Sequence, residues 1–146
     1  MVKDERGFTL IEALISLIIV TIFTLVSYPF VISLYDYFQL NQVLTTLQAD
    51  LHRVRDFNMM PLQEEEQMTL RIYHQENRYV ILVGNQVQEL RHFPGNVTMP
   101  HQNAISNITF NSQGNLGMGR TMIVRSREHE RRVVFSVGMG GFDVRE

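Results

Sequence analysis

A single carboxylate stands inside the most apolar stretch of the sequence. Residues 7–35, GFTLIEALISLIIVTIFTLVSYPFVISLY, contain one charged residue, Glu12. A charge inside hydrocarbon is unfavourable by about 2.5–3.5 kcal/mol on insertion scales, so this carboxylate needs a partner. No Lys, Arg or His lies between Arg6 and Asp36, so the neutralising charge must come from another chain, a terminus or a proton. The alternative is a carboxyl group that reaches back to the nearby membrane interface.

A second group of side chains suited to binding is a set of arginines near the C-terminus. Four arginines flank one turn: Arg125, Arg127, Arg131 and Arg132. Arginine binds phosphate through two parallel hydrogen bonds, so DNA contact is one interpretation of this turn. Glu128 and Glu130 lie in the same turn, and no aromatic residue lies between the arginines for base stacking. A solvated charged hairpin and a subunit–subunit contact are the alternatives.

Residues for catalysis or metal binding form no recognisable pattern. The chain has no Cys, which excludes disulfides, thiolate zinc sites and cysteine nucleophiles. Its five histidines show no H-x-x-x-H or H-E-x-x-H spacing. They are His52, His74, His92, His101 and His129. The acidic run 64–66 is expected to be a solvated loop. We therefore predict that the chain is not an enzyme and holds no metal or other cofactor.

The residues around Glu12 resemble a processing site. Gly7-Phe8-Thr9-Leu10-Ile11-Glu12 follows a short polar leader and opens the apolar stretch. This arrangement resembles the prepilin-peptidase site of type IV pilins and pseudopilins. The resemblance implies cleavage after Gly7 on the cytoplasmic face and N-methylation of the new terminal Phe8. It also implies that Glu12 pairs with the amino terminus of a neighbouring subunit in the filament, which would supply the missing partner.

The apolar segment from Phe8 to Val26 is long enough to span a membrane. It has about the 20 residues that cross ~30 Å of hydrocarbon. Lys3 and Arg6 precede it, and the next cationic residue is Arg53, so the charge balance predicts a cytoplasmic N-terminus. A cleaved secretory signal is the alternative, but no small-x-small site follows and the apolar character continues to Tyr35.

Beyond Pro29 the sequence predicts a helix that is apolar on one side. The apolar residues recur every three or four positions: Tyr37, Leu40, Leu44, Leu47, Leu51 and Val54. Polar residues, including Asp36 and Asp50, fill the other positions. Because Pro61 stops the run, we expect one nearly continuous helix from about Thr9 to Met60, with Pro29 as the place for a bend. The stripe packs on the chain's own sheet or, alternatively, forms a coiled-coil seam with a partner.

From Met68 onward, apolar and polar residues alternate as in β-strands. The expected strands cover residues 68–74, 78–83, 86–91, 105–110, 121–125 and 131–137. Gly84-Asn85 predicts a two-residue hairpin turn. One long helix followed by short antiparallel strands predicts an α+β fold, with the helix laid across a small twisted sheet. The resemblance implies the same type IV pilin-like fold.

The chain is expected to have three parts. They are a leader peptide at residues 1–7, a transmembrane and filament-core helix at residues 8–28, and an extracytoplasmic head at residues 29–146. The chain has 146 residues, of which 45% are hydrophobic, and a formal net charge of −2. This composition excludes a disordered chain and argues against bulk electrostatic binding of nucleic acid. The expected location is the cell membrane, crossed once, and afterwards a filament at the cell surface.

Within pilin-like proteins, the chain is most similar to competence pseudopilins of Gram-positive bacteria, the ComGD type. The similarity rests on the size, the cysteine-free head, the hairpin YVILVGNQVQEL and the character of residues 138–146. It implies a minor subunit of a competence pilus that brings extracellular DNA through the cell wall for transformation. The implied partners are prepilin peptidase, other pilins, an assembly ATPase, a membrane platform protein, and membrane lipid before assembly. A minor pseudopilin of a type II secretion system is the alternative.

Overall fold

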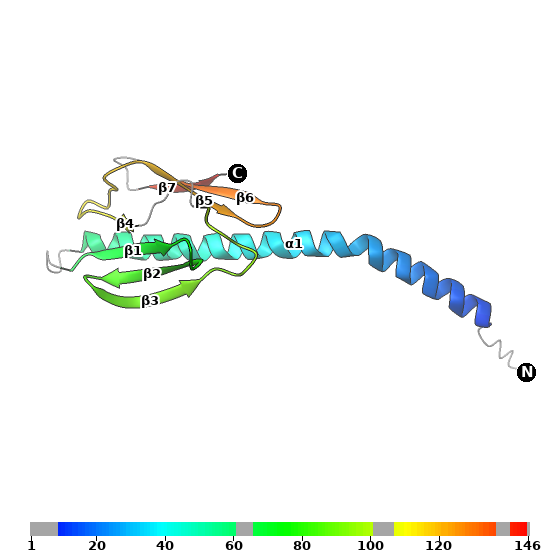
Figure 1. The fold of residues 1–146 in the computed structure, drawn as a ribbon. Helices are drawn as coiled ribbons and strands as arrows, with labels where there is room; N and C mark the ends of the chain where they lie inside the picture. The colour runs from blue at the N-terminus through cyan, green and yellow to red at the C-terminus, as the bar shows by residue number, and fades with distance from the viewer. Residues whose placement is uncertain (1–8, 61–65, 101–106, 137–140, 146) are drawn as a thin grey trace, which may run out of the picture. The chain divides into compact units, whose positions relative to one another are not determined.

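The computed structural model describes residues 9–60, 66–100, 107–136 and 141–145. These residues form one helix followed by seven strands, as Figure 1 shows. The chain divides into two compact units, Met1–Tyr35 and Asp36–Glu146. The α+β class is therefore confirmed, with a long N-terminal helix and small antiparallel sheets. The division into leader, span and head at residues 7 and 28 stays a prediction.

The helix α1 (Leu10–Met59) matches the predicted helix to within one residue at each end. It continues through Pro29, whose ring nitrogen cannot donate the usual hydrogen bond to the carbonyl four residues earlier. Pro61, which we expected to end the helix, lies outside the described residues.

In the second unit, α1 buries one face against the strands. Five of the predicted apolar positions are buried in the core: Leu40, Leu44, Leu47, Leu51 and Val54. The prediction that this stripe packs on the chain's own strands is therefore confirmed. Tyr37 differs, because its side chain stays 39% exposed and its ring lies against that of His129. Asp36 and Asp50, expected on the polar face, are buried instead.

The strands form two antiparallel sheets where one was expected. The first sheet has the order β3-β2-β1-β4 and the second the order β5-β6-β7. The strands of the first sheet are β1 (Met68–Tyr73), β2 (Arg78–Val83), β3 (Gln86–His92) and β4 (Asn107–Thr109). Those of the second are β5 (Arg120–Arg125), β6 (Glu130–Phe135) and β7 (Phe142–Arg145). Alternation predicts where strands lie but not which strands pair, so the sequence did not show the separation.

The predicted β2–β3 hairpin is confirmed. Gly84-Asn85 joins the two strands, and Gly84 has a φ of 56°, which glycine adopts without strain. Of the other expected strands, residues 105, 106 and 137 lie outside the described part of the chain. β7 was not predicted, because it is short and follows a glycine-rich segment.

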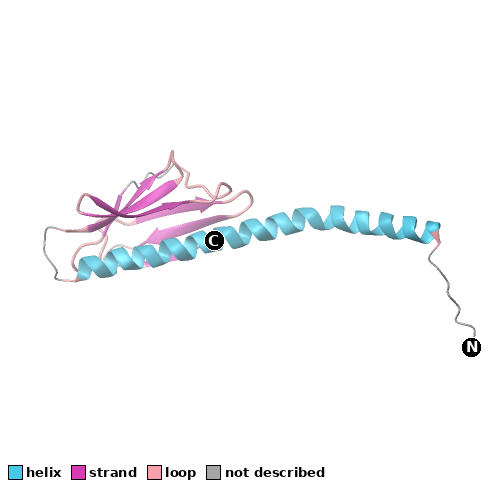
Figure 2. Cartoon of the chain, turned by 90° about the horizontal axis from the view of Figure 1, so that it is seen from below, coloured by secondary structure: helices cyan, strands magenta, loops and turns pink. Residues whose placement is uncertain are grey.

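The core of the second unit lies between α1 and the inner faces of the two sheets. It combines side chains from the helix with strand residues such as Leu70, Ile81, Ile108 and Val133. Figure 2 shows the strands, in magenta, gathered along the half of α1 that belongs to this unit.

Asn58, near the C-terminal end of α1, connects the helix to two strands of the first sheet. Its amide nitrogen donates to the carbonyl oxygens of Met68 (2.8 Å) and Phe110 (3.0 Å). Its amide oxygen accepts from the backbone N–H of Met68 at 2.7 Å. Three hydrogen bonds from one side chain thus fix the helix end to β1 and to the end of β4.

Candidate functional site

Glu12 lies in the first turn of α1 and forms a capping box with Thr9. The backbone N–H and the hydroxyl of Thr9 both donate to Glu12 Oε2, at 3.0 and 2.9 Å. In return, the N–H of Glu12 donates to Thr9 Oγ1 at 3.3 Å. The spacing is the Thr-x-x-Glu pattern that satisfies free N–H groups at a helix N-terminus. The other two residues of the predicted processing site, Gly7 and Phe8, lie outside the described residues.

The capping box gives the Glu12 carboxylate partners within its own chain, which sequence reasoning missed. Thr9 offers two neutral donors to one oxygen of the carboxylate, Oε2, and supplies no positive charge. The N-terminal end of a helix dipole also favours an anion at this position. Glu12 is therefore held in a defined position, while its charge remains available to a cationic partner. The Thr-x-x-Glu spacing is visible in the sequence and could have indicated this arrangement.

Around Glu12, the first unit exposes an apolar surface of the kind that lipid covers. α1 is one helix with the length and composition to cross a membrane, and its most apolar window has no buried residues. Two polar side chains in this window are satisfied internally. Thr21 donates to the Leu17 carbonyl at 2.7 Å and Thr24 to the Val20 carbonyl at 2.8 Å. Such internal bonds remove the penalty for hydroxyl groups in hydrocarbon.

The four arginines of the C-terminal turn do not share one surface. Arg125 and Arg132 lie on the outer face of the second sheet, and both bond to Glu130. Arg125 Nη2 lies 2.6 Å from Glu130 Oε2, and Arg132 Nη2 lies 3.4 Å from Glu130 Oε1. Arg131 pairs in register with buried Val124 and so belongs to the opposite face. Arg127 is exposed in the turn itself.

The pairing of Arg125 and Arg132 with Glu130 favours the alternative that this turn is a charged hairpin. The hydrogen bond from Arg125, together with the charge of Arg132, holds the pKa of Glu130 below its usual value. One carboxylate thus occupies two of the four guanidinium groups. Arg145 of β7 lies opposite Arg132, and sequence reasoning missed it because β7 was not predicted. DNA contact through this turn stays a prediction.

A buried network around Asp50 is a second feature that the sequence did not reveal. The Tyr79 hydroxyl donates to Asp50 Oδ2 at 2.6 Å, and Arg91 Nε donates to the same oxygen at 2.8 Å. Arg91 also contacts Glu89 at 2.6 Å, and Glu89 contacts Arg53 at 2.9 Å. Burial, and then the hydrogen bond to Asp50, raise the pKa of Tyr79, so its hydroxyl stays protonated. The network joins α1 to β2 and β3.

Asp36 is the other buried acid of the helix. Its side chain is 2% exposed, and Asn96 Nδ2 donates to its Oδ1 at 2.7 Å. Its second oxygen has no hydrogen-bond partner among the described residues. The bond ties the start of the second unit to the segment that follows β3.

Metal-binding residues do not gather in the described part of the chain. No group of three or more His, Asp or Glu side chains there is arranged to hold an ion. Glu64, Glu65 and His101 lie outside the described residues.

The N-terminal residues are the part of the chain that matches a known protein family. Residues 2–28 match the protein family described as prokaryotic N-terminal methylation motif. Searches of curated proteins and of solved structures found no significant match to this chain. The matched range includes Gly7, Phe8, Thr9 and Glu12 and most of the exposed apolar helix. The N-terminal part of the chain therefore carries a type IV pilin-like prepilin signal.

Proposed function

We propose that this chain is a pilin-like subunit that is processed and then assembled into an envelope filament. Prepilin peptidase cleaves after Gly7, and the new terminal Phe8 is N-methylated. The observation that carries the proposal is the methylation motif on a helix whose apolar window is entirely exposed. Such a helix needs lipid before assembly and the helices of other subunits afterwards.

In the proposed assembly step, Glu12 recognises the amino terminus of a neighbouring subunit. Cleavage creates a cationic amine at Phe8, and an opposite charge is the partner that an intramembrane carboxylate lacks. The capping box with Thr9 holds the carboxylate at the first turn of the helix before the partner arrives. The neighbour's amine then adds the charge that Thr9 cannot provide. One carboxylate thereby sets the register between subunits.

More specifically, we propose that the filament is a competence pilus and that this chain is one of its minor pseudopilins. The support is the resemblance of the head to the ComGD type in size, lack of cysteine and the β2–β3 hairpin. The proposed role is DNA uptake in transformation, with an assembly ATPase and a membrane platform protein as partners. Lys3 and Arg6 support a single span with a cytoplasmic N-terminus.

A charge-only substitution tests the assembly step. Glu12→Gln keeps a side-chain oxygen that Thr9 can bond, as Gln does in capping boxes, but removes the negative charge. We expect the variant to be processed and to remain in the membrane, while its amount in sheared filaments falls at least tenfold. Glu66→Gln, the same change at an exposed head position, is the matched control and should assemble normally. Normal assembly of Glu12→Gln would contradict the proposed pairing.

The cellular role is tested separately. Deleting the gene is expected to abolish transformation by added DNA and to leave secretion of extracellular proteins unchanged. Complementation with the native chain should restore transformation, and complementation with Glu12→Gln should not. A secretion defect with normal transformation would instead assign the chain to a type II secretion system.

A further inference from the structure

The first sheet has an open edge at β3. Among the described residues, β3 pairs with β2 on one side and with no strand on the other. The Phe93 N–H donates to the carbonyl oxygen of Asn77, just before β2, at 2.9 Å. Successive residues of a strand turn their backbone N–H and C=O groups to opposite sides, so those of Leu90 and His92 point to the open edge. Such an edge is a template for another strand.

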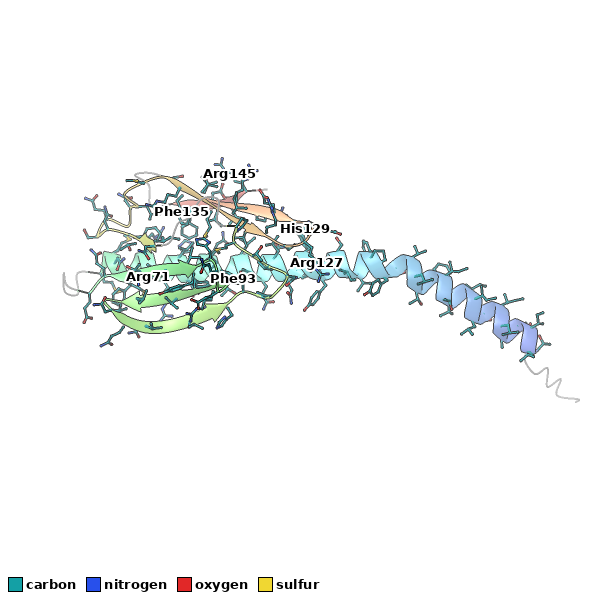
Figure 3. The ribbon with its side chains drawn as sticks, viewed as in Figure 1. Arg71, Phe93, Arg127, His129, Phe135 and Arg145 are labelled. Atoms are coloured by element: carbon teal, nitrogen blue, oxygen red, sulfur yellow. The ribbon has the colours of Figure 1, made fainter. Side chains whose placement is uncertain are left out.

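A groove of about 350 Å³ lies between this edge and α1. Residues 90–94 form its strand side, and Figure 3 shows Phe93 next to α1. The helix side is formed by Gln42, Val43 and Thr46. Leu90, at the open edge, keeps 43% of its side chain exposed. Pockets that hold ligands have volumes of about 300–1,000 Å³, so the groove is large enough for side chains of a partner.

The side of α1 beside the groove is uncharged. No charged residue lies between Gln42 and Ala49, and Arg53, one turn after Ala49, contacts Glu89 of β3 at 2.9 Å. The Thr46 hydroxyl donates to the Gln42 carbonyl at 2.9 Å, so a partner can cover it without leaving its donor unpaired. α1 therefore provides a surface on which a strand added to β3 would rest.

Arg91, which also lines the groove, has a donor group left for a partner. Its Nε donates to Asp50 Oδ2 at 2.8 Å, and its Nη2 lies 2.6 Å from Glu89 Oε1. Its Nη1 has no partner among the described residues, and its side chain is 38% exposed. Because Asp50 and Glu89 already balance the charges of Arg91 and Arg53, the site favours a neutral acceptor oxygen over a further carboxylate.

From the open edge, the groove beside it and the balanced charge around it, we infer that a neighbouring filament subunit adds an extended, uncharged segment to β3. The segment forms a fifth strand of the first sheet, and its backbone bonds to Leu90 and His92. Its side chains on one face fill the groove, and an acceptor oxygen bonds to Arg91 Nη1. Main-chain hydrogen bonds provide the affinity and the groove provides the specificity. The inference rests on the proposed function, because the partner is another subunit of the filament.

Hydrogen exchange at single-residue resolution tests the added strand. The full-length chain in detergent is compared with the chain in sheared filaments. We expect the amides of Leu90 and His92 to exchange at least about tenfold more slowly in filaments, because they gain hydrogen bonds. The amides of Arg91 and Phe93 point to β2 and should change little. This alternation is the signature of a strand, since burial by a partner of another shape would not follow it.

Three outcomes would overturn the inference or its basis. If Leu90 and His92 exchange equally fast in both samples, the edge stays open, and the inference fails while filament assembly stands. If all four amides slow equally, the surface is buried without an added strand, and the inference fails as well. If the chain is absent from filaments, the proposed function itself fails.

Two substitutions at one position separate the main chain from the side chain. Leu90→Pro removes the outward N–H, so its amount in sheared filaments should fall at least about tenfold while its amount in the membrane is unchanged. Leu90→Ala keeps the N–H and should fall by less than about twofold. Normal incorporation of Leu90→Pro would contradict the inference.

The control for proline itself lies on the open edge of the second sheet. The Ser136 N–H donates to the Gly141 carbonyl at 3.0 Å, so by the same alternation the N–H of Val144 on β7 points outward. Val144→Pro should assemble as the native chain does. Thermal unfolding of each variant shows whether the head folds, and hydrogen exchange of the native chain decides the question if Leu90→Pro does not fold.

Discussion

Individual acidic residues in this chain are held in three different ways. Glu12 is bonded by neutral donors of Thr9, Asp50 by a tyrosine hydroxyl and a guanidinium group, and Glu130 by two exposed arginines. Burial decides how much each contact contributes, because water screens an exposed ion pair strongly and a buried one much less. The Asp50 network is therefore expected to stabilise the head most.

Removing the Asp50 carboxylate is predicted to destabilise the head. Asp50→Ala leaves the buried Tyr79 hydroxyl and the half-buried Arg91 without their shared acceptor, so we expect a loss of about 2–3 kcal/mol in the free energy of unfolding. Denaturant unfolding of the full chain in detergent, followed through the tyrosine signal, measures it. Asp143→Ala breaks an exposed ion pair with Arg145 and should change stability by less than about 0.5 kcal/mol. Equal losses in both variants would contradict the account.

The ionisation of Glu130 is predicted to depend on Arg125. Hydrogen bonding from Arg125 holds the pKa of Glu130 below its ordinary value of 4.5. Because the folded value is the lower one, the contribution of Glu130 to stability is present above about pH 4.5 and is lost as the pH falls through the folded value. Arg125→Gln should raise the pKa of Glu130 toward 4.5, and Arg145→Gln should leave it unchanged. Carboxyl chemical shifts followed by NMR decide between these outcomes.

Among the elements, the turn between β4 and β5 approaches the end of α1 closely. A Cβ atom on Gly114 would lie 2.6 Å from Met59 Sδ, and Gly114 has a φ of 75°. Gly114→Ala is therefore expected to reduce the free energy of unfolding by about 1–2 kcal/mol, mainly through the left-handed backbone, since the end of the Met59 side chain can move. Gly117→Ala, with nothing within 4 Å of its Cβ, should be nearly neutral. Thermal unfolding of the two variants side by side provides the comparison.

The helix and the turns could be predicted where their sequence pattern involves residues that are close together in the chain. The apolar periods of α1 and the Gly84-Asn85 turn depend on neighbouring residues, and both are confirmed. The burial of Asp36 and Asp50 could not be predicted, because their partners Asn96, Tyr79 and Arg91 are distant in sequence. The sharing of Glu130 between two arginines also depends on the β5–β6 register. At Glu12, the motif predicted a site but not its internal hydrogen bonds.

At the scale of the whole molecule, the two units differ in what covers their apolar side chains. The second unit covers its own, through a core shared by α1 and two sheets. The first unit does not, since the apolar window of its helix has no buried residues. A chain built this way needs an apolar environment for one part and water for the other. This requirement links the fold to the proposed passage from membrane to filament.

The most direct test of this account is the N-terminus of the protein recovered from its own cells. Intact mass and N-terminal sequencing would be measured for the native chain and for Gly7→Val. The account predicts loss of residues 1–7 and a methylated Phe8 terminus in the native chain, and an uncut chain for Gly7→Val. A native protein that still begins at Met1, or that is cut near Tyr28, would contradict the central claim.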